Sequence, residues 1–240
     1  TAAEYNPFEC VQTNINGAEN VVNAAIRNDV KGVVALSTDK AANPVNLYGA
    51  TKLASDKIFV AGNHLSGRSQ TRFSVVRYGN VLGSRGSVVP YFSKLIAGGA
   101  EFLPVTDKRM TRFWITLPHS VDFVLSSMEM MQGGEIFVPK IPSMRIVDLA
   151  TCMAPELPIK EVGIRPGEKL HEVMITEDDS RTTLELADRF TIEPSFNRWS
   201  SERVPPEDAV MVPDGYRYAS DTNTDWIDLE DMGRLLREDK

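Results

Sequence analysis

The order of the predicted elements in the first third of the chain most constrains its fold. A short, continuous apolar run at residues 33–36 predicts a strand that is covered on both faces in a parallel sheet. Helical patterns lie before it at 14–26 and after it at 48–60, and residues 73–78 predict the next strand. Helices that alternate with strands in this way are typical of a doubly wound parallel sheet. The sequence therefore predicts an α/β protein.

Reactive side chains are concentrated between the strand and the second helix. Residues 37–52 hold the hydroxyl of Thr38, the phenol of Tyr48 and the amine of Lys52, with a turn at Asn43-Pro44. If the helix opens at Tyr48, then Tyr48 and Lys52 share one of its faces, and the ammonium group lowers the phenol pKa. A tyrosine and a lysine at this spacing are by themselves more often a solvated pair. The hydroxyl at the carboxyl end of the strand, where such sheets bind ligands, favours a catalytic site.

Composition and charge limit the classes of protein that remain. The chain has 240 residues, 42% of them hydrophobic, which is enough for a sizeable core. A net charge of −7 with dispersed Lys and Arg does not indicate a nucleic-acid-binding surface. Cys10 and Cys152 are far apart in sequence, and we expect free thiols and no metal site. No leader and no long apolar run are present, so we expect no membrane association and a cytoplasmic location.

Three motifs together carry a resemblance to a known family. They are STDKAANPVNLYGATK at 37–52, RYGNVLGSRGSVVP at 77–90 and GIRPGEKLHE at 163–172. The chain resembles the extended short-chain dehydrogenase/reductases, and specifically the inverting UDP-N-acetylglucosamine 4,6-dehydratases of polysaccharide and pseudaminic acid biosynthesis. The resemblance extends to about residue 176. It implies a Rossmann-like doubly wound sheet, incomplete at the N-terminus, with a smaller C-terminal substrate lobe.

The resemblance also implies how the chain is divided. Residues 1–82 would be the second half of an NADP-binding domain with the catalytic residues, and 83–176 a mixed substrate-binding lobe that partly returns to the sheet. Residues 177–240 would be a polar C-terminal extension with a closing helix. A dinucleotide fold needs a glycine-rich turn after its first strand, and none precedes residue 12. We therefore expect the chain to be a fragment that lacks the first half of the nucleotide-binding sheet.

Each catalytic role in the family has a matching position here. The resemblance implies that Tyr48, aided by Lys52, takes the proton of the sugar C4 hydroxyl, which Thr38 orients. It implies that Lys40 removes the C5 proton and that Asp39 protonates the departing C6 hydroxyl. Retaining relatives generally carry methionine at position 48, so the tyrosine indicates inversion at C5. The implied cofactor is NADP, with NAD as the alternative, and the implied contacts to it are Ser37, Thr38, Tyr48, Lys52 and Val81.

The implied partners are a UDP-sugar substrate and further copies of the chain in a homo-oligomer. The substrate contacts would be Asn80, Arg85, Gly86, Ser87, Val88, Arg112, Arg165 and Glu168. An arginine can hold a diphosphate through two parallel hydrogen bonds. Structural alternatives remain for two of these residues: Arg112 could stack on its aromatic neighbours, and Arg165 could form an ion pair with Glu168.

Two other functions remain open at this point. A nucleotide-sugar 4-epimerase of the same superfamily would use Thr38, Tyr48 and Lys52 but would not need an acid and a base at positions 39 and 40. A truncated, non-catalytic fragment that binds UDP or takes part in assembly is the second alternative.

Overall fold

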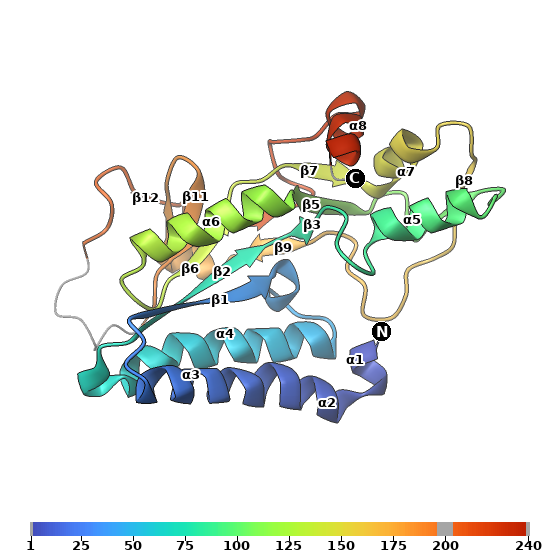
Figure 1. Cartoon of the computed structure of the whole chain (residues 1–240). Helices are drawn as coiled ribbons and strands as arrows, with labels where there is room; N and C mark the ends of the chain where they lie inside the picture. Colours follow the sequence, from blue (N-terminus) through green and yellow to red (C-terminus); the bar gives the residue numbers. More distant parts are fainter. Residues whose placement is uncertain (1, 196–203, 239–240) are drawn as a thin grey trace. The chain divides into compact units, whose positions relative to one another are not determined.

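The structure, a computed structural model, describes residues 2–195 and 204–238. It divides into two compact units, and the chain passes between them more than once (Figure 1). Unit 1 holds residues 1–78, 122–140 and 173–218, and unit 2 holds residues 79–121, 141–172 and 219–240. This division differs from the three consecutive parts 1–82, 83–176 and 177–240 that we expected, because segments distant in sequence share one sheet.

Unit 1 is built on a six-stranded sheet with the order β1-β2-β6-β11-β10-β12. Strands β1, β2 and β6 run parallel, and β11, β10 and β12 continue the sheet in antiparallel pairs. Both strands predicted from the first third of the sequence are confirmed, and they pair in parallel. The strands are β1 (Gly32–Thr38), β2 (Arg72–Tyr78), β6 (Ile136–Pro139), β10 (Thr183–Glu185), β11 (Arg189–Ile192) and β12 (Val210–Met211).

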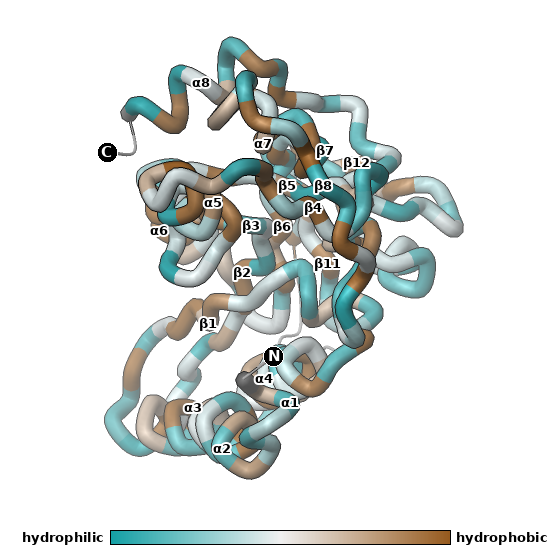
Figure 2. The backbone as a smooth tube through the Cα atoms, turned by 90° about the vertical axis from the view of Figure 1, so that its right-hand side faces the viewer, coloured by the Kyte–Doolittle hydropathy of each residue, from teal (hydrophilic) through white to brown (hydrophobic). Residues whose placement is uncertain are grey.

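Helices pack on both faces of this sheet. Helices α3 (Gly17–Arg27) and α4 (Leu47–Leu65) lie side by side along one face, and α6 (Leu117–Met130) runs along the other (Figure 1). Side chains of β2 alternate between the faces: Phe73 contacts Phe59 of α4, whereas Val76 packs against Phe123 of α6. Hydrophobic and hydrophilic residues alternate along α3 and α4 (Figure 2), as expected for helices with one buried face.

Strand β1 differs from our expectation of a strand covered on both faces. It is the outer strand of the described sheet, and most of its residues are only partly buried. Leu36 is 51% exposed. The apolar character of the run correctly indicated a strand, but the burial of a strand also depends on the neighbours that pack on it, which the run itself does not reveal.

The ends of unit 1 contain more regular structure than the sequence indicated. The described residues before α3 form α1 (Ala2–Tyr5), α2 (Pro7–Val11) and a π-helical turn at Gln12–Asn16. Proline suits the first position of a helix, which explains how Pro7 fits there. Residues after 176, expected as a polar extension, include the strands β10, β11 and β12. Short β9 (Val173–Ile175) and β13 (Tyr218–Ala219) lie at the limits of this region.

Unit 2 is smaller and has its own core. Its elements are β3 (Asn80–Val81), α5 (Val88–Ala97), β4 (Leu103–Val105), β5 (Thr111–Ile115), β7 (Ser143–Arg145), α7 (Ile146–Met153), β8 (Ile159–Glu161) and α8 (Leu229–Glu238). β3, β5 and β7 form one sheet and β4 pairs with β8. Leu149 of α7 and Met232 of α8 are fully buried in this core, so the predicted closing helix packs as part of unit 2. Among the described residues, no helix has the length and apolarity needed to span a bilayer.

Candidate active site

The end of β1 and the start of α4 place the predicted catalytic residues. A 3-10 turn at Asp39–Ala41 follows β1, and the Thr38 hydroxyl accepts a hydrogen bond from the Lys40 amide at 3.4 Å. The Asn46 side chain caps α4 by accepting from the amide of Gly49 at 2.8 Å. Helix α4 therefore opens at Leu47, one residue before the expected start at Tyr48, and Tyr48 and Lys52 lie four residues apart in its first turns.

A carboxylate between a hydroxyl and an amine forms the centre of this segment. Thr38 Oγ1 donates to Asp39 Oδ1 at 2.8 Å, and Lys40 Nζ donates to the same oxygen at 3.0 Å. The Asp39 side chain is fully buried, whereas that of Lys40 is 34% exposed. The second carboxylate oxygen, Asp39 Oδ2, is buried and has no hydrogen-bond partner among the described residues. Thr38, Asp39 and Lys40 are thus in mutual hydrogen-bond contact.

The phenol and the second amine lie on α4 beside this cluster. Lys52 Nζ donates to the carbonyl oxygen of Leu36 at 2.7 Å, which holds it against the last residues of β1. Burial lowers the pKa of Lys52, and the negative charge of Asp56 acts in the opposite direction. Tyr48 is 40% exposed. A partly exposed phenol at the carboxyl end of a parallel strand is accessible to a ligand.

The pKa of Tyr48 differs from our expectation. Burial raises it above its ordinary value of 10.0, and the nearby carboxylate of Asp39 raises it further. The cation that lowers the pKa of Tyr48 is Lys40, not Lys52. The helical spacing correctly predicted that Lys52 lies on the same helix as the phenol, but Lys52 is held by the Leu36 carbonyl.

Ser37 has a different role from the cofactor contact that we expected. Its side chain is buried, and its hydroxyl donates to Asp56 Oδ2 at 2.8 Å. The Ser37 hydroxyl therefore forms a hydrogen bond within unit 1. Sequence analysis missed Asp56, although its position four residues after Lys52 on α4 was a usable signal.

The predicted substrate residues, together with Val81, belong to unit 2. Asn80 and Val81 form β3 and pair with Trp114 and Ile115 of β5. The following loop exposes Arg85 and Gly86, and Gly86 has a φ of +78°, which favours glycine. Ser87 precedes α5, which begins at Val88, and the Ser87 hydroxyl is buried without a hydrogen-bond partner among the described residues. The contacts of these residues with a substrate stay predictions.

Arg112 is used to hold the chain of unit 2 together. Its Nη1 donates to the carbonyls of Thr111 at 2.7 Å and Leu170 at 3.1 Å, and its Nη2 donates to that of Lys169 at 3.0 Å. Its Nε lies 3.7 Å from Glu172 Oε1. Because these donors are directed at the protein and the residue is buried, the arrangement favours the structural alternative over a substrate contact.

Arg165 lies in a contrasting environment. Its side chain is 60% exposed and lies 3.8 Å from Glu168 in an ion pair. Exposed pairs of this kind contribute little to stability, so the guanidinium can exchange its partner for a phosphate at small cost. The ion pair foreseen as the structural alternative is present, and the geometry leaves the predicted substrate contact possible.

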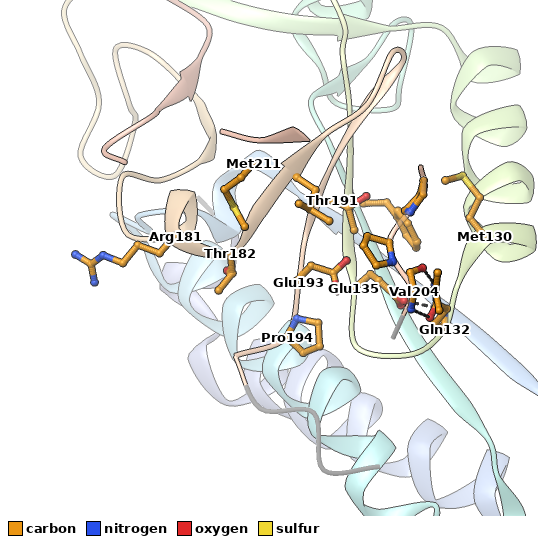
Figure 3. A pocket seen from close by; sticks show the side chains of 14 residues that line it. Met130, Gln132, Glu135, Arg181, Thr182, Thr191, Glu193, Pro194, Val204 and Met211 are labelled. Carbon is orange, nitrogen blue, oxygen red and sulfur yellow. Dashed lines mark hydrogen bonds between the residues drawn. The ribbon is translucent and has the colours of Figure 1, made fainter. Parts of the chain in front are cut away.

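A pocket elsewhere in unit 1 holds none of the predicted site residues. Side chains such as Met130, Thr191 and Met211 line it (Figure 3). Its buried acid, Glu135, accepts hydrogen bonds from the Ser74 hydroxyl and from the amides of residues 132 and 133. The carboxylate is therefore satisfied by the protein. Within residues 2–195 and 204–238, no group of His, Cys, Asp and Glu could hold a metal ion.

Solved structures define the class of protein to which this fold belongs. The chain is similar to Pen from Bacillus thuringiensis, with a TM-score of 0.88 and 38% identity over 98% of this chain and 71% of that one. It is also similar to DesIV, a dTDP-glucose 4,6-dehydratase from Streptomyces venezuelae, with a TM-score of 0.60, 21% identity, and 67% and 56% of the two chains covered. The second likeness shows the fold alone. The predicted Rossmann-like α/β class is confirmed.

Sequence comparison identifies the family. Residues 1–194 match the family described as polysaccharide biosynthesis protein, and the chain belongs to it. It is 58% identical over 235 residues, 96% of this chain and 70% of the relative, to a UDP-N-acetylglucosamine 4,6-dehydratase (inverting) from Campylobacter jejuni subsp. jejuni serotype O:23/36 (strain 81-176). A UDP-glucose 4-epimerase from Rickettsia canadensis (strain McKiel) is 38% identical, with 97% of this chain and 69% of the relative covered.

Proposed function

We propose that the chain carries the catalytic residues of a UDP-N-acetylglucosamine 4,6-dehydratase that inverts C5 of the sugar. The observation that carries the proposal is the Asp39–Lys40 pair, which lies in hydrogen-bond contact beside Thr38 and near Tyr48. An elimination needs an acid and a base in one site, and this pair supplies both. The 58% identity to a relative of that name supports the same reaction.

The reaction requires a nicotinamide dinucleotide, which accepts and returns a hydride when it is bound. The donor set at the end of β1 fits the nicotinamide ribose, because the Tyr48 phenol and the Lys52 ammonium can hydrogen-bond to its hydroxyls. Tyr48 and Lys52 would hold this end of the cofactor, with Thr38 and Val81 as further contacts. We propose NADP as the form used, with NAD as the alternative.

The protonation states of the acid and the base follow from their contact. Asp39 Oδ1 and Lys40 Nζ form a salt bridge, 3.0 Å apart. Transfer of one proton from Lys40 Nζ to Asp39 Oδ1 produces a neutral amine and a carboxylic acid, without exchange of a proton with solvent. The amine then takes the C5 proton while the acid protonates the departing C6 hydroxyl, which leaves as water. Elimination therefore restores the ion pair that the structure shows.

The remaining residues prepare and complete this step. Tyr48 takes the proton of the C4 hydroxyl, which Thr38 orients, and the resulting C4 ketone acidifies the C5 hydrogen. C5 finally receives a proton from solvent on its opposite face, and C6 would carry the returned hydride. Arg85, Ser87 and Arg165 are the proposed contacts to the UDP group.

The biological setting belongs to the same proposal. A UDP-sugar substrate, a homo-oligomeric state, a cytoplasmic location and a place in pseudaminic acid synthesis rest on the resemblance to the inverting dehydratases and on the matched family.

A 4-epimerase is the second candidate, because a relative with that name matches 97% of the chain. Inversion at C4 needs Thr38, Tyr48 and Lys52 but leaves the Asp39–Lys40 pair without a function. The test is to supply UDP-N-acetylglucosamine and NADP in heavy water and to follow the sugar by proton NMR. Dehydration produces a 6-methyl signal and deuterium at C5, and both should be lost in Lys40→Met. An isomeric sugar that keeps its C6 hydroxyl would instead identify an epimerase.

The third candidate is a fragment that binds UDP but performs no chemistry. Titration of the 240-residue chain with NADP and separately with UDP tests it. Binding of both would support the dehydratase. Binding of UDP without NADP would favour the non-catalytic fragment.

A further inference from the structure

A buried carboxylate joins three elements below the candidate active site. Asp56 of α4 is 1% exposed, and its Oδ2 accepts from Ser37 Oγ at 2.8 Å and from Arg77 Nη2 at 3.4 Å. Ser37 and Arg77 are direct register partners on the parallel strands β1 and β2. One carboxylate oxygen thus connects α4 to the carboxyl ends of both strands. None of the proposed chemical steps uses this group.

A second attachment lies one helical turn earlier. Lys52 donates to the carbonyl of Leu36, the residue before Ser37 in β1. Two side chains four residues apart on α4 therefore hold two successive residues of one strand. A helix held at two points about 6 Å apart along its axis cannot rotate or slide without breaking one of them. Tyr48 lies one turn further toward the start of the same helix.

Burying the charge of Asp56 costs free energy, and polar and cationic side chains from several elements compensate this cost. Burial raises the pKa of Asp56, while Arg77, the Ser37 hydroxyl and Lys52 act to lower it. Arg77 is itself 2% exposed, donates to the carbonyl of Met174 at 3.0 Å and lies 3.7 Å from Asp179. Buried ion pairs of this kind are weak contributors to stability, and their best-attested use is to select one geometry.

We propose that Asp56 is a positioning residue, which through Ser37 and Arg77 fixes α4 on the sheet and thereby sets the places of Lys52 and Tyr48. The inference rests on the proposed function only in treating Tyr48 and Lys52 as the catalytic pair. Asp56 does not touch the reacting atoms, so its removal should slow the chemical step and leave substrate binding largely intact.

The first test compares two isosteric substitutions around the same arginine. Asp56→Asn removes the charge on α4, whereas Asp179→Asn removes the second carboxylate near Arg77 without touching α4. For Asp56→Asn we expect kcat to fall by roughly tenfold to a hundredfold, because a displacement of about 1 Å can cost on the order of a hundredfold. KM for UDP-N-acetylglucosamine should stay unchanged. Asp179→Asn should retain kcat.

A double variant separates positioning from stability. Asp56→Asn leaves the buried Arg77 poorly compensated, so loss of activity could reflect unfolding alone. Asp56→Asn combined with Arg77→Met removes both charges and should recover stability in urea denaturation, while kcat stays low. Recovery of kcat together with stability would show a merely structural role and overturn the proposal.

Amide hydrogen exchange on the ligand-free chain gives a readout that needs no activity. We expect faster exchange at residues 48–52 in Asp56→Asn and in the double variant, and no change in Asp179→Asn. If Asp56→Asn does not fold, the double variant and Ser37→Ala, which keeps both charges, replace it. Unchanged exchange at 48–52 in folded variants would refute the positioning role. If exchange in the variants changes as expected but the wild-type chain does not dehydrate UDP-N-acetylglucosamine, only the proposed function is refuted.

Discussion

The α-carbon of Gly49 lies against the carbonyl oxygen of Lys40, so closely that a Cβ at position 49 would be 2.2 Å from that oxygen. The same Cβ would lie 3.0 Å from Cβ of Pro44. Only a residue without a side chain lets the start of α4 approach the turn that carries the acid and the base. Gly49 therefore sets the separation between Tyr48 and the Asp39–Lys40 pair.

Gly49→Ala should reduce both stability and activity. Because the contact is with backbone, the turn at 39–41 must shift, and overpacking of this kind costs about 1–3 kcal/mol. Gly17→Ala in α3 is a matched control, since a Cβ at position 17 would lie 3.7 Å from its nearest neighbour, the carbonyl oxygen of Gln12. There alanine should be neutral or stabilising by roughly 0.5–1 kcal/mol. Urea denaturation measures both variants, and equal effects would contradict the proposed role of the close approach.

The pKa of Tyr48 should respond more strongly to Lys40 than to Lys52. A neighbouring cation stabilises the phenolate and lowers the phenol pKa, so removing Lys40 in Lys40→Met should raise the pKa of Tyr48 further above 10.0. Lys52→Met should have a smaller effect. Carbon NMR of labelled tyrosine, with the signal assigned by its loss in Tyr48→Phe, follows the titration. A larger rise in Lys52→Met than in Lys40→Met would restore our sequence-based interpretation.

Substitution of two arginines of unit 2 should have opposite consequences. Arg112→Ala removes three hydrogen bonds to carbonyls and one of the two cations beside Glu172, and should destabilise the chain by about 1–3 kcal/mol. Arg165→Ala removes an exposed side chain, so thermal unfolding should be unchanged while UDP binding weakens about tenfold. Melting curves and UDP titration measure the two effects. Normal UDP affinity in Arg165→Ala would remove Arg165 from the substrate site.

As the pH falls, the contact between Asp107 and Arg109 should weaken before the rest of the structure. The Arg109 side chain and amide hydrogen-bond to Asp107 and lower its pKa from 3.8 to about 2. A carboxyl group whose pKa is lowered by folding contributes stability above its unfolded value, and that contribution is lost as the pH falls through its folded value. The difference in melting temperature between wild type and Asp107→Asn should therefore be largest above about pH 4 and close toward pH 2. A difference that grows below pH 4 would contradict this assignment.

The sequence was most informative where one local pattern determines both structure and chemistry. The apolar run at 33–36 and the residues after it predicted a strand, a turn and a helix, and the structure has all three, with Thr38, Asp39 and Lys40 in mutual contact. Strand β2 was predicted for the same reason. These features depend on short-range periodicity and on turn chemistry, both of which are visible in a single sequence.

Features that depend on long-range pairing were not predictable. Strands β10 and β11 are short and lie in a polar segment, and they exist because β11 pairs with β6, which is about 50 residues earlier in the chain. The hydrogen-bond partner of the Ser37 hydroxyl was not predictable, because a hydroxyl at a strand end can face a ligand or a buried acid equally well. Only the placement of Asp56 on α4 decides between them.

The allocation of roles between two separately packed units has a consequence for how such proteins diversify. The proposed acid and base, the phenol and the amine all belong to one continuous stretch of sixteen residues in unit 1, at 37–52. The proposed contacts to the nucleotide lie in unit 2, which has its own core around Leu149 and Met232. Substitutions in unit 2 that change which sugar nucleotide is bound can therefore accumulate without disturbing the core of unit 1. Substrate preference and reaction type can be inherited and selected as separate traits.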